Sequence, residues 1–114
     1  MTVYGIKICN TVKSALDWLK KNKIEFDFHD YKSKGITEGK LKAWSKQVGW
    51  ESLINKRGTT WRQLDEATQK KITNEKVAIA LMLEKTSVIK RPLIEEDGKV
   101  LVLGFDEEEY KNKF

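Results

Sequence analysis

The stretch that decides the fold is Thr2–Leu19, which has the sequence TVYGIKICNTVKSALDWL. Its first part, Thr2–Lys7, alternates and is rich in branched and aromatic side chains, so it predicts a β-strand. Apolar residues recur at helical spacing over the second part, which predicts a helix almost directly after the strand. Cys9 lies at the junction, and we expect Asn10 or Thr11 to cap the amide groups that open the helix.

The residues after this helix predict a second strand and then a block of helices. Ile24–His29 alternates, and a crossover of this length favours parallel pairing with the first strand. Helical patterns fill the middle of the chain, including a short helix over Trp61–Gln69. We expect Thr37 to cap the first of these helices and Thr73 to cap a longer helix after the short one.

The end of the chain returns to strands. Asp97-Gly98 separates two apolar runs, and Asp-Gly in that position is the strongest short signal for a β-hairpin. Asp106, with Glu109 three residues later, predicts the start of a final short helix. The predicted order is therefore β-α-β, a helical block, β-β and α, in a single domain that covers residues 1–114.

Composition excludes several classes of protein. The 114 residues are 39% hydrophobic and 34% charged, which is typical of a globular protein with one core. A single cysteine excludes an internal disulfide, and one cysteine with one histidine cannot close a tetrahedral metal site. The longest strongly apolar stretch, Val77–Leu83, is too short to cross a bilayer. No charged segment followed by an apolar one opens the chain, so we expect a cytoplasmic protein without membrane contact.

The net charge of +5 does not by itself indicate a nucleic-acid-binding protein. Nineteen of the 22 basic residues are lysines; they are interleaved with Asp and Glu and form no long block. Arginine, which recognises phosphates in a bidentate manner, occurs only as Arg57, Arg62 and Arg91. We therefore expect no direct contact with DNA.

Cys9 is the strongest candidate for chemistry. A thiol between a strand and a helix lies where unpaired helix amides and the positive end of the helix dipole converge, and both favour its ionisation. Lys13, in the first helical turn, adds a cation nearby. The competing interpretation is that Cys9 is a small buried hydrophobic residue, the commonest fate of a free cysteine.

The second candidate is Arg91-Pro92, at the start of the hairpin. A cis proline there would turn the backbone sharply and present the preceding residue to a ligand, and Arg91 would bind a carboxylate or an oxyanion. The alternative is a trans proline beside a surface arginine. Arg57 lies in a polar loop that suits an anion, although no phosphate-binding pattern surrounds it, and His29 is expected to be structural.

Taken together, these features resemble the arsenate reductase (ArsC)/Spx superfamily, and most of all its YffB-like branch. The motifs that carry the resemblance are Tyr4–Lys7 with Cys9–Ala15, Phe28–Lys32, Asn55–Arg62 and Ile89–Pro92. The resemblance covers essentially the whole chain. It implies an α/β fold with a thioredoxin/glutaredoxin-like β-α-β…β-β-α core, at residues 1–31 and 86–114, and a helical insertion at 36–84. It also implies that Pro92 is cis and lies beside Cys9.

The sequence departs from the arsenate reductases of this family, which use a cysteine and three arginines that hold the oxyanion. Cys9 matches the nucleophile and Arg91 matches the arginine before the proline. The last arginine falls near Leu103-Gly104, and the middle one near Asn55, with Arg57 two residues later as an imperfect substitute. Loss of one or two such partners, each worth about 1.5–3 kcal/mol, would weaken oxyanion binding by at least about tenfold.

The resemblance thus implies a glutathione- or glutaredoxin-dependent thiol reductase, expected as a monomer, with Cys9 as its catalytic nucleophile. Glutathione would be a co-substrate, and no tightly bound cofactor or metal is expected. The residues expected to bind the substrate are Asn10, Thr11, Val12, Lys13, Arg57, Arg91 and Pro92. Two alternatives stay open: an Spx-like transcriptional regulator that binds the alpha subunit of RNA polymerase, and an arsenate reductase. Many Spx proteins carry a C-x-x-C switch, whereas Val12 stands at its fourth position here.

Overall fold

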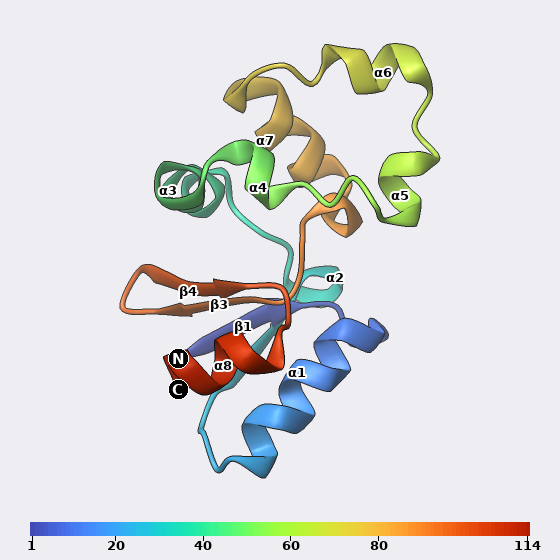
Figure 1. The fold of residues 1–114 in the computed structure, drawn as a ribbon. Helices are drawn as coiled ribbons and strands as arrows, with labels where there is room; N and C mark the ends of the chain where they lie inside the picture. The colour runs from blue at the N-terminus through green and yellow to red at the C-terminus, as the bar shows by residue number, and fades with distance from the viewer. The chain divides into compact units, whose positions relative to one another are not determined.

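The computed structural model describes all residues from Met1 to Phe114, and they form two compact units (Figure 1). The first unit combines Met1–Lys34 with Arg91–Phe114 and contains the β-sheet. The second unit, Gly35–Lys90, is helical. The sheet unit is therefore built from two segments of the chain that the helical unit separates.

The sheet unit holds four strands. β1 (Thr2–Gly5) lies between β2 (Asp27–Asp30) and β3 (Leu93–Glu96), and β4 (Lys99–Leu103) pairs with the other side of β3. β1 and β2 are parallel and are joined by helix α1 (Asn10–Lys21), while the other two pairings are antiparallel. The predicted β-α-β and β-β orders are confirmed.

β2 is shorter than the predicted strand Ile24–His29. The backbone N–H of Ile24 donates to the carbonyl of Leu19 (2.9 Å), so this residue still closes the end of α1. Sheet pairing begins where the N–H of Asp27 donates to the carbonyl of Met1 (2.9 Å). The local hydrogen bonds of the turn therefore override the alternating pattern at its first residues.

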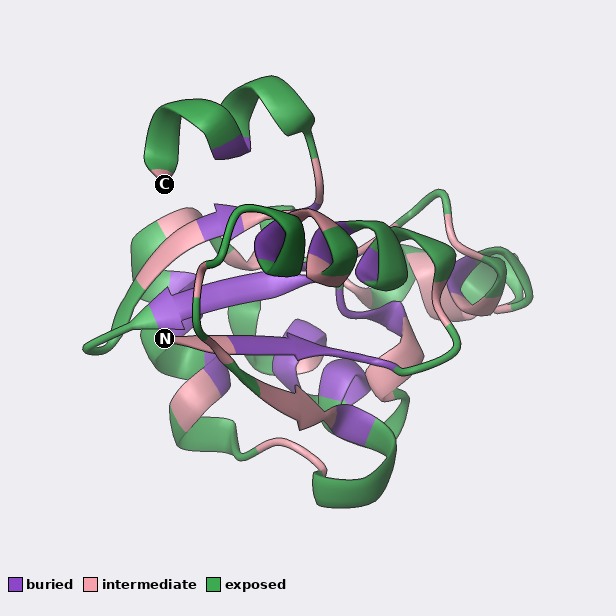
Figure 2. Ribbon diagram, turned by 90° about the horizontal axis from the view of Figure 1, so that it is seen from below, coloured by how far each residue is buried: buried purple, intermediate pink, exposed green.

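Helices α1 and α8 (Glu107–Lys113) cover one face of the sheet (Figure 1). Figure 2 shows β1 and β3 almost wholly buried, whereas the helices are exposed on their outer sides. The core of this unit consists of side chains from both strands and both helices, with one from β4: Val3, Ala15, Leu19, Ile94, Val102 and Tyr110. Burial of this apolar surface is the main source of the unit's stability.

The hairpin between β3 and β4 turns as predicted. Asp97 and Gly98 both adopt positive φ angles, of 50° and 80°, which is the conformation that a two-residue hairpin turn requires. Of these two residues, glycine adopts it without a steric penalty, and aspartate is one of the few others that tolerates it.

Two of the predicted helix caps are confirmed. Asp106 Oδ1 accepts a hydrogen bond from the N–H of Glu109 (3.2 Å) at the start of α8. Thr37 Oγ1 accepts one from the N–H of Lys40 (3.2 Å) at the start of α3 (Glu38–Val48). Each bond satisfies an amide that the first turn of a helix leaves unpaired.

Two other predicted caps are wrong. Asn74, not Thr73, caps α7 (Glu75–Glu84), because its side chain accepts a backbone N–H of the first turn at 3.1 Å. In α1, neither Asn10 nor Thr11 is the cap: the helix already begins at Asn10, and Cys9 occupies the cap position in an extended conformation without a side-chain cap bond. The first amides of α1 are therefore left for another acceptor.

The helical unit contains short helices around a buried core. α3 and α4 both contact α7, and its largest fully buried side chains include Trp44, Leu41, Leu53 and Met82. Its helices are α3 (Glu38–Val48), α4 (Trp50–Leu53), α5 (Thr59–Arg62), α6 (Glu66–Lys71), α7 (Glu75–Glu84) and the 3-10 helix η1 (Thr86–Val88). The sheet unit also contains the short helix α2 (Tyr31–Lys34).

The helical unit differs from its prediction in two places. The single helix predicted over Trp61–Gln69 is two helices, because Asp65 accepts the N–H of Thr68 (2.7 Å) and starts α6. The unit also extends to Lys90, because Ile89 forms an antiparallel bridge with Ile54 in the middle of the unit. No helix in the structure is both long enough and apolar enough to cross a membrane.

Tyr110 anchors α8 to the sheet unit. Its side chain is fully buried, and its Oη donates to the carbonyl of Gly104 (2.7 Å). Its ring lies edge-on to Trp18, Phe105 and Phe114, with centroids 4.8–5.5 Å apart. Burial raises the pKa of this hydroxyl well above its usual range, so it remains a donor.

We predict that Tyr110→Phe lowers the free energy of unfolding by about 1–3 kcal/mol, because the buried carbonyl of Gly104 loses its donor while the ring packing stays. Urea denaturation measures this change. Tyr110→Ala should cost more, about 3–5 kcal/mol, since it also leaves a cavity. Equal stability of the Phe variant and the wild type would contradict the role of the hydrogen bond.

Candidate functional site

One edge of the sheet brings two predicted candidates, Cys9 and Arg91-Pro92, together with Tyr31, which the sequence did not single out. Cys9 follows the end of β1, and Tyr31 follows the end of the parallel strand β2. β3 runs antiparallel to β1, with Leu93 opposite Tyr4, so Arg91-Pro92 enters at the same edge. Ligands of α/β proteins bind at the carboxyl ends of parallel strands. A ligand-binding site is therefore expected at this edge of the sheet.

A close contact between β1 and α1 positions Cys9. A Cβ atom on Gly5 would lie 2.8 Å from Cγ2 of Val12, so only glycine allows the first turn of the helix to approach the strand this closely. The N–H of Cys9 donates to the carbonyl of Ile6 (3.2 Å), which closes the turn between them. As a result, the first amides of α1 lie next to the Cys9 sulfur.

The surroundings of Cys9 favour its thiolate form. Partial burial alone would raise the pKa of the Cys9 thiol, but three groups oppose it. They are the backbone N–H of Val12, the hydrogen bond and charge of the Arg91 side chain, and the backbone N–H of Thr11. The balance places the pKa below the usual 9.0 of the thiol. Donors that favour an anion lower its pKa and keep a reactive thiolate available.

Pro92 is held at the same edge. The Arg91-Pro92 peptide bond is cis, as the resemblance implied. The N–H of Gly104 donates to the carbonyl of Pro92 (2.7 Å), which fixes the proline to the end of β4. Pro92 is buried and Arg91 is half-buried. The arginine therefore has a defined backbone position from which its side chain reaches the sulfur.

The other predicted residues differ in their surroundings. Asn10 and Lys13 are exposed in the first turn of α1, and Lys13 is not among the groups that lower the pKa of Cys9. Arg57 belongs to the helical unit, not to the unit that holds Cys9. It lies beside a hollow of about 410 Å³ lined by Ile54, Asn55, Lys56, Arg57 and Lys90.

Sequence reasoning missed a buried polar cluster on the face of the sheet opposite α1. Tyr4 Oη donates to Glu95 Oε1 (3.1 Å), and both side chains are buried. The ring of Tyr4 lies 4.8 Å from that of His29 and 6.2 Å from that of Tyr31. Alternation places Tyr4, His29 and Glu95 on one face, but only pairing of the strands reveals that they are neighbours.

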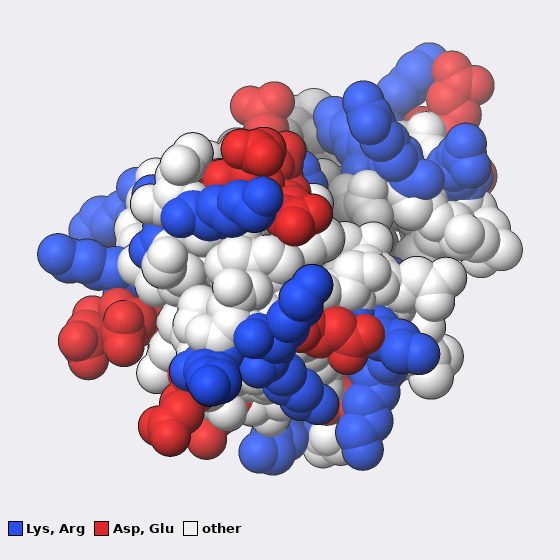
Figure 3. Space-filling model, turned by 60° about the horizontal axis from the view of Figure 1, so that its bottom comes forward, with Lys and Arg blue, Asp and Glu red and all other residues white.

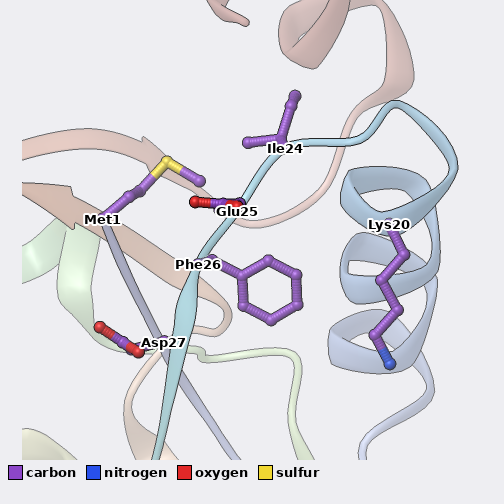
Figure 4. A pocket seen from close by; sticks show the side chains of 6 residues that line it. All are labelled: Met1, Lys20, Ile24, Glu25, Phe26 and Asp27. Atoms are coloured by element: carbon purple, nitrogen blue, oxygen red, sulfur yellow. The ribbon is translucent and has the colours of Figure 1, made fainter.

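A hollow at the other end of the sheet unit is unrelated to Cys9. It has a volume of about 650 Å³ and is lined by Met1, Lys20, Ile24, Glu25, Phe26 and Asp27. Figure 4 shows Phe26 between the chain that leads into β2 and helix α1. It contains none of the predicted site residues.

Figure 3 shows basic side chains distributed among acidic and uncharged ones on the face in view, without a single continuous basic patch.

Comparison with known proteins identifies the family. A profile of the ArsC family matches residues 4–113. The chain belongs to the ArsC family. This confirms the superfamily inferred from the sequence, which is a superfamily of thiol-dependent reductases.

Similarity to individual proteins accompanies this family match. The chain is 46% identical over its whole length to an uncharacterized protein of Haemophilus influenzae, 98% of which is covered. It is 44% identical to a protein of known structure named YFFB, with a TM-score of 0.90 over 98% of this chain and 96% of that one. A more distant relative is the global transcriptional regulator Spx of Streptococcus pyogenes, 24% identical over 97% of this chain and 82% of Spx. The predicted fold class is confirmed.

We predict that Arg91→Gln raises the pKa of Cys9 and slows its alkylation by iodoacetamide several-fold at neutral pH, because the thiolate loses a hydrogen bond and a positive charge. Alkylation rates as a function of pH measure the pKa. Lys13→Gln is the matched control, since Lys13 is exposed in the first turn of α1 and is not among the groups that lower the pKa of Cys9. An equal effect of both substitutions would contradict the specific role of Arg91.

The lowered pKa also predicts a pH dependence of stability. A thiol whose pKa is lower in the folded chain stabilises the fold fully above its unfolded value, and this contribution is lost as the pH falls through the folded value. The wild type should therefore gain stability relative to Cys9→Ser as the pH rises from neutrality towards 9.0. Urea unfolding of both proteins over this range measures the difference, and a constant difference would disprove the shift.

Proposed function

We propose that this chain is a glutathione-dependent thiol reductase with Cys9 as its nucleophile. The single observation that carries the proposal is the set of groups around the sulfur: the N–H groups of Thr11 and Val12 and the Arg91 side chain lower its pKa. A thiolate, not a thiol, attacks disulfides. The proposed substrate is a mixed disulfide between glutathione and another thiol.

The proposed reaction has two exchange steps. The Cys9 thiolate attacks the glutathione sulfur of R–S–S–G, the disulfide bond breaks, and R–S⁻ leaves with the electron pair of that bond. Cys9 is then joined to glutathione by a new disulfide. A second glutathione, as thiolate, attacks the glutathionyl sulfur of this adduct, releases the Cys9 thiolate and forms G–S–S–G. R–S–S–G is reduced, and two glutathione sulfurs end as a disulfide.

An external thiol is required because Cys9 is the only cysteine of the chain. No second cysteine is available to attack the adduct, so glutathione or a glutaredoxin must do so. In this proposal, Asn10, Lys13 and Pro92 border the bound glutathione, while the role expected of Arg57, which belongs to the helical unit, stays a prediction. Because the chain has a single cysteine, its oxidised form cannot be an internal disulfide.

The proposal favours a disulfide over arsenate as substrate. Leu103 and Gly104, where the last arginine of an arsenate site would fall, carry no charge. The buried hydroxyl of Tyr110 is already used by the carbonyl of Gly104, so it does not replace that arginine. Arsenate-dependent oxidation of glutathione should therefore remain at the uncatalysed rate.

We predict that the wild type reduces a glutathionylated peptide in the presence of glutathione, whereas Cys9→Ser leaves only the uncatalysed rate. Peptide release followed by chromatography measures turnover, and intact mass spectrometry should detect one glutathionyl group on the wild type. Ser14→Ala, an exposed change further along α1, is the control for general effects on the helix. Wild-type turnover equal to that of Cys9→Ser would refute the proposal.

A second candidate is a regulator that binds the alpha subunit of RNA polymerase, and the similarity to Spx over most of both chains favours it. In that case the surface, not the thiol, carries the function. Pull-down with purified polymerase distinguishes the two: stoichiometric capture that is unchanged in Cys9→Ser, together with absent reductase turnover, would favour the regulator.

A further inference from the structure

The hydroxyl of Tyr31 is a buried donor that the protein itself does not use. The Tyr31 side chain is 2% exposed, and its Oη has no hydrogen-bond partner in the structure. A buried hydroxyl without a partner destabilises a folded protein, and most buried polar side chains have one. The reductase chemistry proposed above does not involve this group.

The hydroxyl of the neighbouring Tyr4, by contrast, has a hydrogen-bond partner. Tyr4 lies next to Tyr31, with the two rings stacked at 6.2 Å and inclined by 27°. The Oη of Tyr4 donates to Glu95 Oε1 (3.1 Å), whereas the Oη of Tyr31 makes no such bond. Glu95 also acts electrostatically on Tyr31, but its Oε1 already accepts from Tyr4.

The position of Tyr31 relates it to the thiol. Tyr31 directly follows β2, at the same edge of the sheet as Cys9 and Arg91-Pro92. The charge of Arg91 acts on the Tyr31 hydroxyl, and the same side chain makes a hydrogen bond to the Cys9 sulfur. Burial raises the pKa of Tyr31 well above its usual range, so it keeps its proton wherever Cys9 is ionised. A hydroxyl on which the charge of a guanidinium group acts is a suitable second donor for an oxygen anion.

We infer that Tyr31 Oη and the Arg91 side chain together bind a carboxylate of the compound whose sulfur reacts with Cys9. This inference rests on the proposed function and narrows its substrate class to thiols and disulfides that carry a carboxylate close to the sulfur. Arg91 supplies the charge, and Tyr31 supplies a directional hydrogen bond. A carboxylate has two oxygens, one for each donor.

Two small disulfides of similar length test the inference: dithiodiglycolate, which carries a carboxylate at each end, and the neutral bis(hydroxyethyl) disulfide. The Cys9 thiolate attacks one sulfur of either probe, forms a mixed disulfide with half of it and releases the other half as a thiolate. The rate constants are measured by intact mass spectrometry at one pH. Their ratio, anionic over neutral, cancels changes in the reactivity of the thiolate itself.

The wild type should react faster with dithiodiglycolate than with the neutral probe. Tyr31→Phe should lower the ratio of the two rate constants about tenfold, because one hydrogen bond to a charged group is lost. Tyr4→Phe is the matched control: it removes the neighbouring hydroxyl, should keep the ratio, and should lower stability because Glu95 loses its donor. Tyr31→Phe should be at least as stable as the wild type, since its hydroxyl has no partner to lose.

An unchanged ratio in Tyr31→Phe would overturn the inference and leave the proposed function intact. Failure of both probes to modify wild-type Cys9 would overturn the proposed function and the inference with it. Binding without reaction gives a second measurement: titration of Cys9→Ser with dithiodiglycolate should shift the NMR signals of Tyr31 and Arg91. The same titration of Cys9→Ser/Tyr31→Phe should require about tenfold more ligand, and equal affinity would again overturn the inference.

Discussion

The contact between the end of β1 and the first turn of α1 is the constraint on which the site depends. Gly5 has no side chain, and Val12 of the helix occupies the space that a Cβ would fill. Because the strand and the helix meet this closely, Cys9 becomes the residue at the helix cap, and the N–H groups of Thr11 and Val12 act on its sulfur. Arg91 completes the set from the other segment of the chain.

Much of the fold follows from local patterns, and the errors arise where a tertiary or turn contact decides. The parallel β1–β2 pair, the Asp97-Gly98 turn and the cap at Asp106 each depend on one short stretch of the chain, and all agree with the sequence. The start of β2 does not agree with the sequence prediction, because the hydrogen bond from the N–H of Ile24 to the carbonyl of Leu19 keeps Ile24 at the end of α1. The cap of α1 differs because the backbone at Cys9, not a polar side chain, begins the helix.

The candidate site was only partly predictable for a related reason. Cys9 and Arg91 carry recognisable chemistry, and each stands beside a local signal, a strand end or a proline. Tyr31 and Glu95 have no such signal: a tyrosine after a strand and a glutamate within one are ordinary residues. Only the register of β1 with its two neighbours places them around Tyr4, and only the folded structure shows that the Tyr4 hydroxyl has a partner while the Tyr31 hydroxyl does not.

The division of the sheet unit into two segments has a consequence for the newly made chain. On the ribosome, β1, α1 and β2 emerge first, and the whole helical unit must follow before Arg91 and β3 become available. Until then one side of β1 lacks its neighbouring strand, and the Cys9 sulfur lacks the hydrogen bond and the positive charge of Arg91. A nascent polypeptide that has not yet reached Arg91 therefore carries a less acidic cysteine than the folded sheet unit.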